Sequence, residues 1–291
     1  MTDDQALRCP EVVGGFALQE KVWAEFRVDR LKQIEWNSEA YDRLEMDKEL
    51  KGVIEALVAG HRQHSATNHH LPQFDDIIAG KGLGLSFLLQ GPPGLGKTLT
   101  AESVAKQLKK PVYSVTSGEL GTTVRDMEIN LRKAFGIAKE WNAILLLDEA
   151  DVFMSKRSVD NLEKNAFISV FLRLMEYYQG ILFLTTNRAE DFDEAFISRI
   201  HLIIDYQPLD ASRRKIIWQN LAKNVTDQED KSLDDATFEY LSTRYDINGR
   251  EIKNMLRTAW SLARSEEKPL RLEHIQRVAD IWAAGRKASK D

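Results

Sequence analysis

The chain has 291 residues, of which 43% are hydrophobic and 29% charged, an ordinary globular composition with room for about two domains. Its formal net charge of -5 argues against nucleic acid as a partner and gives no reason to expect binding to anionic membranes, although a local basic patch stays open. The single cysteine, Cys9, excludes a disulfide framework within one chain. It favours an intracellular, reducing compartment, without distinguishing cytoplasm, nucleus or organelle matrix.

The sequence shows neither a membrane span nor a leader. No apolar run approaches the roughly 20 residues that cross a bilayer. The first residues lack the basic and apolar regions of a signal peptide. We therefore expect no membrane span, and we note that an abrupt start is also compatible with a piece of a longer protein.

Residues 1–72 are interpreted as an N-terminal segment, the part in which partner specificity is expected. The run Val12–Leu18 is typical of a strand broken by a glycine pair, and apolar residues from Trp23 to Trp36 predict packing against another part of the chain. Hydrophobic residues at helical spacing predict a helix from Tyr41 to Gln63.

Four histidines follow within ten residues, at positions 61, 64, 69 and 70. A metal site is one interpretation of such a cluster. The flanks are polar and contain no further cysteine or carboxylate cluster, which favours a helix end followed by a solvated linker.

Residues 73–206 alternate between strand and helix signals. Alternation of this kind predicts an α/β domain, here a five-stranded parallel sheet with helices on both faces, one of them from Leu162 to Tyr178. The predicted strands are Ser86–Gln90, Val112–Val115, Ala143–Leu147, Ile181–Thr185 and Ile200–Asp205.

Residues 207–291 lose the strand signal and predict a small all-α second domain. Pro208 and Pro269 interrupt the pattern. The predicted helices are Ala211–Lys223, Asp234–Arg244, Gly249–Ser265 and Leu272–Ala288.

A glycine-rich loop lies between the first predicted strand and a helix. Its sequence, Gly91-Pro92-Pro93-Gly94-Leu95-Gly96-Lys97-Thr98, fits G-x-x-x-x-G-K-[ST], the phosphate-binding loop of nucleoside triphosphatases. Such a loop points backbone N–H groups and a helix N-terminus at phosphate oxygens. We therefore expect the loop and Leu99 after it to bind ATP or ADP. Lys97 would bridge the β- and γ-phosphates, and Thr98 would offer its hydroxyl to Mg²⁺.

Two carboxylates end a later apolar strand, about fifty residues downstream of the loop. They are Asp148 and Glu149, after Ile144–Leu147. Ligands bind at the carboxyl ends of such strands. Asp148 is expected to hold Mg²⁺ and Glu149 to polarise the attacking water, because hydrolysis of a γ-phosphate needs a positioned water and neutralised charge.

The loop together with Leu147-Asp148-Glu149-Ala150-Asp151 closely resembles the AAA+ ATPases, and the resemblance extends from about Phe74 to Ala288. Segments including Phe171-Leu172-Arg173 and Ser198–Leu202 are similar to a group of fungal AAA+ proteins in which this core follows a longer N-terminal region. The resemblance implies that the helical domain is a lid and that the chain assembles as a homo-oligomer, with a hexameric ring expected.

The resemblance also implies roles for three further residues. Asn187 matches the sensor 1 position, where a neutral amide orients the attacking water. Arg199 matches the arginine finger that reaches the nucleotide of the next subunit, but the segment has one arginine and no Pro-Gly, so a surface ion pair is the alternative. Arg250 matches sensor 2, with a salt bridge at a helix start as the alternative.

Two weaker inferences concern the base and the substrate. Ile77, Ile78 and Gly80 occupy the position where family members wrap the adenine, although such aliphatic residues are also ordinary core residues. In protein-threading members an aromatic-glycine pair follows the second strand. The matching stretch, Ser117–Val124, has no aromatic residue, so that only Leu120 or Val124 could grip a polypeptide, and weakly.

The leading functional interpretation is a Mg²⁺-dependent AAA+ ATPase that remodels a protein partner of unknown identity. The Ser-Arg form of the finger and the lid arginine suggest a nucleotide-gated loader acting on nucleic acid as an alternative. A non-catalytic ATP-dependent scaffold is a third interpretation.

Overall fold

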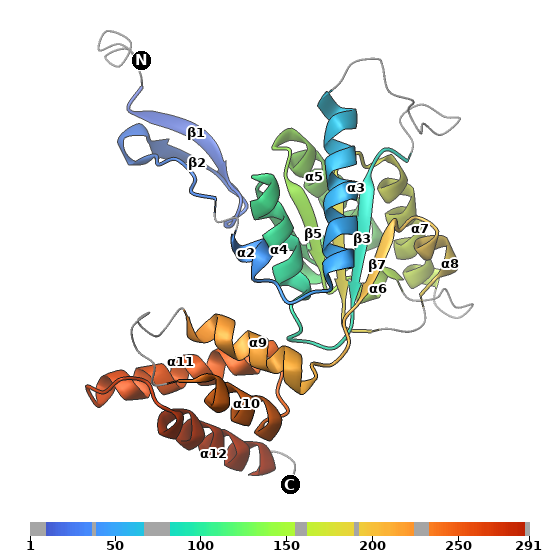
Figure 1. The fold of residues 1–291 in the computed structure, drawn as a ribbon. Helices are drawn as coiled ribbons and strands as arrows, with labels where there is room; N and C mark the ends of the chain where they lie inside the picture. Colours follow the sequence, from blue (N-terminus) through green and yellow to red (C-terminus); the bar gives the residue numbers. More distant parts are fainter. Residues whose placement is uncertain are drawn as a thin grey trace.

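The computed structural model describes residues 10–36, 39–66, 82–154, 162–188, 192–223 and 233–288. They form a β-hairpin, an α/β domain and a group of lid helices, in that order along the chain (Figure 1). Among the described residues, no helix combines the length and the apolar character needed to cross a bilayer.

The α/β domain is built on a five-stranded sheet with the strand order β4-β5-β6-β3-β7. Every pairing in it is parallel, which confirms the predicted fold class. Its strands are β3 (Leu85–Gln90), β4 (Val112–Thr116), β5 (Ile144–Asp148), β6 (Ile181–Thr186) and β7 (Leu202–Asp205). Because all strands run the same way, their carboxyl ends meet at one edge, and the loops after β3, β5 and β6 lie together there.

Helices cover both faces of the sheet because every second side chain of a strand points to the same face. In β5, Ile144 and Leu146 belong to one buried cluster, and Leu145 and Leu147 belong to the other. The first cluster includes side chains of α3 (Lys48–Ala66) and α4 (Lys97–Leu108). The second includes side chains of α5 (Val124–Glu140) and α7 (Leu162–Tyr177).

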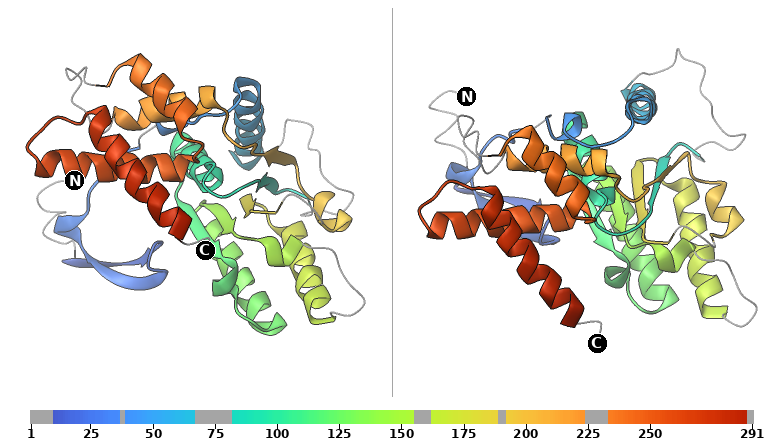
Figure 2. Two further views of the ribbon diagram at one scale, coloured as in Figure 1. Left: turned by 90° about the horizontal axis from the view of Figure 1, so that it is seen from below. Right: turned by 60° about the horizontal axis from the view of Figure 1, so that its bottom comes forward.

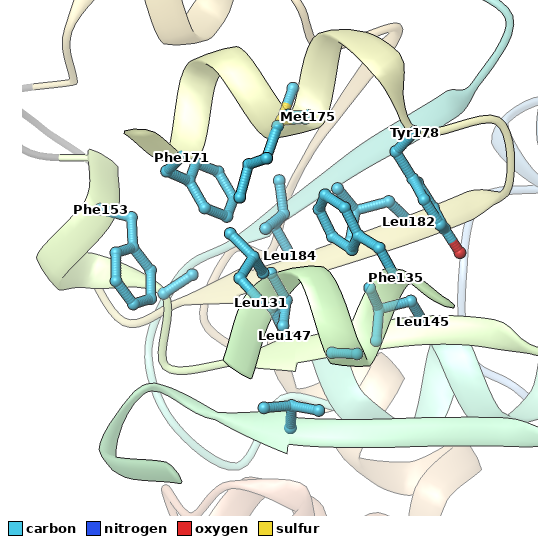
Figure 3. Packing of buried hydrophobic residues seen from close by; sticks show 14 of the residues in the cluster. Leu131, Phe135, Leu145, Leu147, Phe153, Phe171, Met175, Tyr178, Leu182 and Leu184 are labelled. Atoms are coloured by element: carbon cyan, nitrogen blue, oxygen red, sulfur yellow. The ribbon is translucent and has the colours of Figure 1, made fainter. Parts of the chain in front are cut away.

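The α5–α7 cluster is rich in stacked aromatic rings (Figure 3). Phe153 of α6 (Asp151–Met154) stacks on Phe171 at 5.2 Å between ring centroids. Phe171 in turn stacks on Phe196 of α8 (Glu194–Ile197) at 5.9 Å. These contacts fix α6, which follows the acidic strand end, and α8, which precedes Arg199, against the same core.

The lid consists of α9 (Ala211–Ala222), α10 (Asp235–Arg244), α11 (Gly249–Ser265) and α12 (Leu272–Ala288), close to the predicted bounds. It has its own buried core around Trp218. Side chains of Asp210, Asp234 and Asn248 cap the first three of these helices, which explains where each begins. Figure 2 shows the lid helices as a body of their own beside the α/β domain.

The N-terminal segment differs from its prediction. The strand β1 (Val12–Ala17) runs through the glycine pair without a break, and it pairs antiparallel with β2 (Val22–Arg27), a strand that the sequence pattern does not predict. A 3-10 turn, η1 (Val28–Arg30), follows. In Figure 1 the hairpin extends away from the sheet, and Trp23 is 73% exposed despite the expectation that this segment would pack.

The hairpin is nevertheless anchored to the α/β domain. Phe16 contacts the ring of Tyr113 on the edge strand β4, with 6.3 Å between centroids. Lys21 forms an ion pair of 2.6 Å with Glu119 in η2 (Ser117–Leu120), the turn that follows β4. The hairpin therefore covers part of an open sheet edge.

The helix predicted from Tyr41 to Gln63 is two helices, α2 (Glu39–Asp42) and α3. Asp47 explains the interruption, because its Oδ1 accepts a 2.8 Å hydrogen bond from the backbone N–H of Glu49 and so starts α3. The hydrophobic spacing continues across the break, and spacing alone therefore could not reveal it.

Candidate nucleotide-hydrolysis site

The glycine loop leads from β3 directly into α4 and leaves the start of that helix uncapped. Gly96 precedes α4 with a positive φ of 99°, no side chain caps the helix, and its first turn contains no acidic residue. By contrast, α5, α8, α9, α10 and α11 each begin with a side-chain cap. The free N–H groups and the positive end of the helix dipole of α4 are therefore available to an anion.

Gly91 and Gly94 are required by both backbone conformation and space. Gly91 has a φ of 133°, and a Cβ there would overlap the carbonyl oxygen of Tyr206. Gly94 has a φ of 79°, and its Cβ would lie 2.5 Å from Oδ1 of Asn248 in the lid. Only glycine combines these conformations with such close neighbours.

Lys97 is held inside the loop and is only 8% exposed. Its Nζ donates to the carbonyl oxygens of Gly91 at 2.6 Å and Pro92 at 2.8 Å, and to Oδ1 of Asn187 at 2.9 Å. Burial lowers the pKa of Lys97; Asp148 and Asp151 oppose this shift, and the charge of Arg250 adds to it. The remaining predicted loop residues, Pro93, Leu95 and Leu99, are partly or fully exposed, and Leu99 lies on the first turn of α4.

Thr98 and Asp148 place a hydroxyl and a carboxylate next to each other. Thr98 Oγ1 donates to Asp148 Oδ1 at 3.4 Å. The same carboxylate oxygen accepts a hydrogen bond from Thr185 on the neighbouring strand β6. Hydroxyl and carboxylate oxygens are the hard ligands that Mg²⁺ prefers, and Mg²⁺ usually completes its shell with water and phosphate oxygens. These two residues thus fit a Mg²⁺ ion.

Glu149 has an unusual backbone for a residue with a side chain, since its φ is 56°. The backbone N–H of Glu149 donates to Thr185 Oγ1 at 3.1 Å, and that of Ala150 donates to the carbonyl oxygen of Thr185 at 2.9 Å. Such strained conformations persist where surrounding contacts hold them and are common at functional sites. The Glu149 side chain itself is exposed at the same sheet edge as the loop.

Thr185 is a site residue that sequence reasoning missed, although it links both acidic residues. It is 2% exposed and contacts Asp148 through its hydroxyl and Glu149 through the backbone. Its neighbour Thr186 makes an analogous hydrogen bond to Asp151. A polar pair at the end of an otherwise apolar strand was the available signal, but by itself it indicates no more than the lead-in to Asn187.

Asn187 follows β6, which lies between β3 and β5 in the sheet. Its contact with Lys97 therefore joins the glycine loop to the strand beside Asp148 and Glu149. The sheet order thus brings Lys97, Thr98, Asp148, Glu149 and Asn187 to one edge.

The lid reaches the loop through the start of α11. The backbone N–H of Arg250 donates to the carbonyl oxygen of Gly94 at 3.3 Å. Asn248 caps α11 in a reciprocal arrangement with Glu251 and packs on Gly94, so the lid residue in closest contact with the loop is one that the sequence did not single out. Arg250 lies near enough to Lys97 to affect its pKa.

Arg199 lies at the opposite end of the sheet. It follows α8 and precedes β7, and its turn hydrogen-bonds Ser86 near the start of β3. At roughly 3.3 Å per residue, the five residues from Ser86 to Gly91 place the finger turn about 16 Å from the loop of its own subunit. Its guanidinium contacts the carbonyl oxygen of Ala195 and lies 3.7 Å from Glu176, so an ion pair is present as the alternative interpretation foresaw.

Ile77, Ile78 and Gly80, predicted to wrap the adenine, lie outside the described residues. A different segment lies beside the loop helix. Tyr41, in α2 next to α4, is buried, and burial followed by the charge of Glu55 raises its pKa to about 12. The carbonyl oxygen of Arg43 accepts a 3.4 Å hydrogen bond from Asn220 of α9. Residues 41–43 therefore bridge the α/β domain and the lid.

Two other expectations also changed. Leu120 is 1% exposed, so it cannot grip a polypeptide, and Val124 is the half-buried first residue of α5. Cys9, His69 and His70 lie outside the described residues, as does the side chain of His64. Within the described part of the chain no group of three or more potential metal ligands occurs.

The glycine loop, the acidic strand end and Asn187 lie within residues 87–208, which match the family model described as "ATPase family associated with various cellular activities (AAA)". The chain contains an AAA domain. The flanking hairpin and most of the lid lie beyond the matched range.

Relatives of the AAA domain carry the same kind of name. The chain is 28% identical over 221 residues to the human "ATPase family AAA domain-containing protein 3B", covering 72% of this chain and 32% of the relative. It is 29% identical to "ATPase family AAA domain-containing protein 3-A" of Xenopus laevis, covering 73% and 41%. It is 34% identical to "Fidgetin-like protein 1" of Drosophila melanogaster, covering 45% and 27%.

The chain spans between a quarter and about two fifths of the length of these relatives. They support nucleotide binding and ATPase activity for AAA domains in general. The narrower similarity to fungal members stays a prediction.

Proposed function

We propose that this chain binds ATP with Mg²⁺, hydrolyses it in an oligomer, and couples hydrolysis to remodelling of a protein partner. One observation supports the catalytic part most directly. Lys97, Asn187, Thr98 and Asp148 are linked by hydrogen bonds or adjacent strands around a helix N-terminus that no side chain caps. Phosphate is the ligand that such an arrangement fits best.

The residues divide the work of hydrolysis. The loop N–H groups and Lys97 bind the phosphates, and Thr98 and Asp148 hold Mg²⁺, which neutralises charge on the phosphate oxygens when bound. Glu149 and Asn187 orient the water that attacks the γ-phosphorus, whereupon the bond to ADP breaks. Residues 41–43 and the start of α11 form the walls between which the base and the phosphates lie.

The proposed oligomer follows from the position of Arg199. Because Arg199 lies at the opposite end of the sheet from its own glycine loop, it serves a nucleotide only when a second copy presents its loop to that end. An arginine supplied in this way typically accelerates turnover by about 10³- to 10⁵-fold. A closed ring, with six subunits expected, would give every subunit one neighbour of each kind.

A protein partner is favoured over nucleic acid by the net charge of -5. Processive threading is disfavoured, since the turn after β4 lacks an aromatic residue and its only large aliphatic side chain, Leu120, is buried. A switch that changes the angle between the lid and the α/β domain fits the contacts of Arg250 and Asn248 with Gly94.

The test is ATPase rate per subunit against protein concentration, with mass measured in ATP. Wild type should show turnover that rises with concentration. Lys97→Ala should lose nucleotide binding, Glu149→Gln should bind and assemble without turnover, and Arg199→Ala should bind without turnover. ATP binding without turnover at any concentration would instead indicate a scaffold, and stimulation by DNA or RNA that decreases with salt would indicate a loader.

A further inference from the structure

The turn that carries Arg199 is attached to β3 by one buried serine. Ser86 is 5% exposed, and its Oγ donates to the carbonyl oxygen of Arg199 at 2.5 Å. The carbonyl oxygen of Ser86 accepts a 2.9 Å hydrogen bond from the backbone N–H of His201. Ser86 therefore holds the backbone on both sides of the peptide that follows Arg199.

The side chain of His201 completes this attachment. Its Nδ1 accepts a 3.1 Å hydrogen bond from the backbone N–H of Ser86 and lies 2.9 Å from Ser86 Oγ. Because a backbone N–H can only donate, Nδ1 is the unprotonated ring nitrogen. The Ser86–His201 clamp, as we call these two residues, lies one residue before the ladder between β3 and β7, which begins at Phe87 and Leu202.

The guanidinium of Arg199 is held much less firmly than its backbone. One terminal nitrogen donates to the carbonyl oxygen of Ala195 at 2.6 Å, the other lies 3.7 Å from Glu176, and Nε is buried with no hydrogen-bond partner among the described residues. The side chain lines a cavity of about 230 Å³ together with Ser86, Glu176 and His201. A fixed backbone with a loosely held side chain beside open space suits a residue that must swing toward another molecule.

We infer that Ser86 and His201 are positioning residues for Arg199, and that they hold its backbone so that the guanidinium can leave Glu176 and reach the nucleotide of a neighbouring subunit. The inference rests on the proposed role of Arg199 between subunits. A displacement of about 1 Å in a catalytic group can cost about 100-fold in rate, so loss of the clamp is costly even though neither residue touches nucleotide.

Substitution of the clamp should change turnover without changing nucleotide binding. Ser86→Ala should lower kcat by about 10- to 100-fold and leave KM for ATP within about threefold. Ser86→Thr keeps the hydroxyl and has the cavity to receive its methyl group, so it should restore most of kcat. Ser242→Ala is the matched control, because Ser242 is equally buried but lies in α10, where its hydroxyl donates to Glu239.

His201 offers a second, independent pair of variants. His201→Asn keeps an acceptor near the position of Nδ1 and should retain most of kcat. His201→Leu removes the acceptor and should lower kcat in the same way as Ser86→Ala. Thermal unfolding of all variants checks folding, and a loss of kcat that follows only the loss of stability, regardless of the acceptor, would contradict the positioning role.

Mixing subunits decides whether the effect acts on the neighbour. Ser86→Ala subunits are mixed with excess Lys97→Ala subunits, which lack nucleotide binding but have an intact clamp and Arg199. The rate per Ser86→Ala subunit should rise severalfold, because its own site then receives an intact arginine. Arg199→Ala in the same mixture is the reference, and mass measurement confirms that mixed assemblies form.

The mixtures separate the two claims. If neither Ser86→Ala nor Arg199→Ala is rescued, the shared site of the proposed function is wrong. If Arg199→Ala is rescued and Ser86→Ala is not, the shared site stands and the clamp acts within its own subunit, through β3 and the glycine loop. Rescue of both supports the inference.

Discussion

Replacement of Thr185 by valine tests how the acidic pair is held. Valine has nearly the same shape, so it leaves no large cavity in β6, but it lacks the hydroxyl. That hydroxyl donates to Asp148 and accepts from the N–H of Glu149. The substitution thus removes both contacts that tie the end of β5 to β6 through a side chain.

The magnitude follows from the two lost hydrogen bonds. A hydrogen bond to a charged group contributes about 1.5–3 kcal/mol, and a buried N–H left without a partner costs about 1–3 kcal/mol. Because the Asp148 side chain is only half-buried, water recovers part of its loss. We therefore expect the free energy of unfolding to fall by about 2–4 kcal/mol, and kcat to fall by about 10- to 100-fold as Asp148 and Glu149 lose their positions.

Denaturant unfolding and steady-state ATPase assays measure the two effects. Thr185→Ser is the control, since it keeps the hydroxyl and loses only one methyl group, worth about 0.8 kcal/mol. It should retain most of kcat. A Thr185→Val variant with wild-type stability and turnover would refute the idea that this hydroxyl holds the acidic pair.

Three further predictions concern the loop, the lid and the far edge of the sheet. Gly91→Ala should lose ATP binding in an equilibrium binding assay, because its Cβ would overlap the carbonyl oxygen of Tyr206; unchanged affinity would contradict the close approach of these two backbones. Arg250→Ala should weaken ATP binding about tenfold, the loss of roughly 1.4 kcal/mol from one charge-assisted contact, whereas unchanged affinity and turnover would assign Arg250 to a structural ion pair. Burial lowers the pKa of His201 below 6.5, so the unfolded chain binds the proton more readily, and stability should fall as pH drops below about 6.5. The thermal midpoint of His201→Asn should depend less on pH in this range than that of wild type, and equal slopes would refute the assignment.

Local sequence determined the glycine loop, the acidic strand end and the elements around them. Short apolar runs bounded by polar residues identified all five strands of the parallel sheet, because strands buried on both faces must be apolar throughout. The uncapped start of α4 is also a local property, since capping depends on the residues immediately before and after a helix start.

The N-terminal hairpin illustrates what a local pattern cannot show. The glycine pair in β1 predicts a break, but pairing with β2 supplies the hydrogen bonds that keep the strand continuous. Likewise, residues 41–43 carry no motif, and their place between α4 and α9 depends on where the lid folds back. Contacts between residues distant in sequence decided both outcomes.

By itself, then, the sequence determined which residues can bind phosphate and Mg²⁺, because those abilities belong to residue types at fixed spacing. Only the tertiary structure decided that Thr185 holds the acidic pair, that Asn248 packs on the glycine loop, and that Ser86 and His201 hold the turn of Arg199. The physical reason is the order of the sheet. It places β3 between β6 and β7, so that one end of β3 meets the catalytic edge and the other end meets the finger turn.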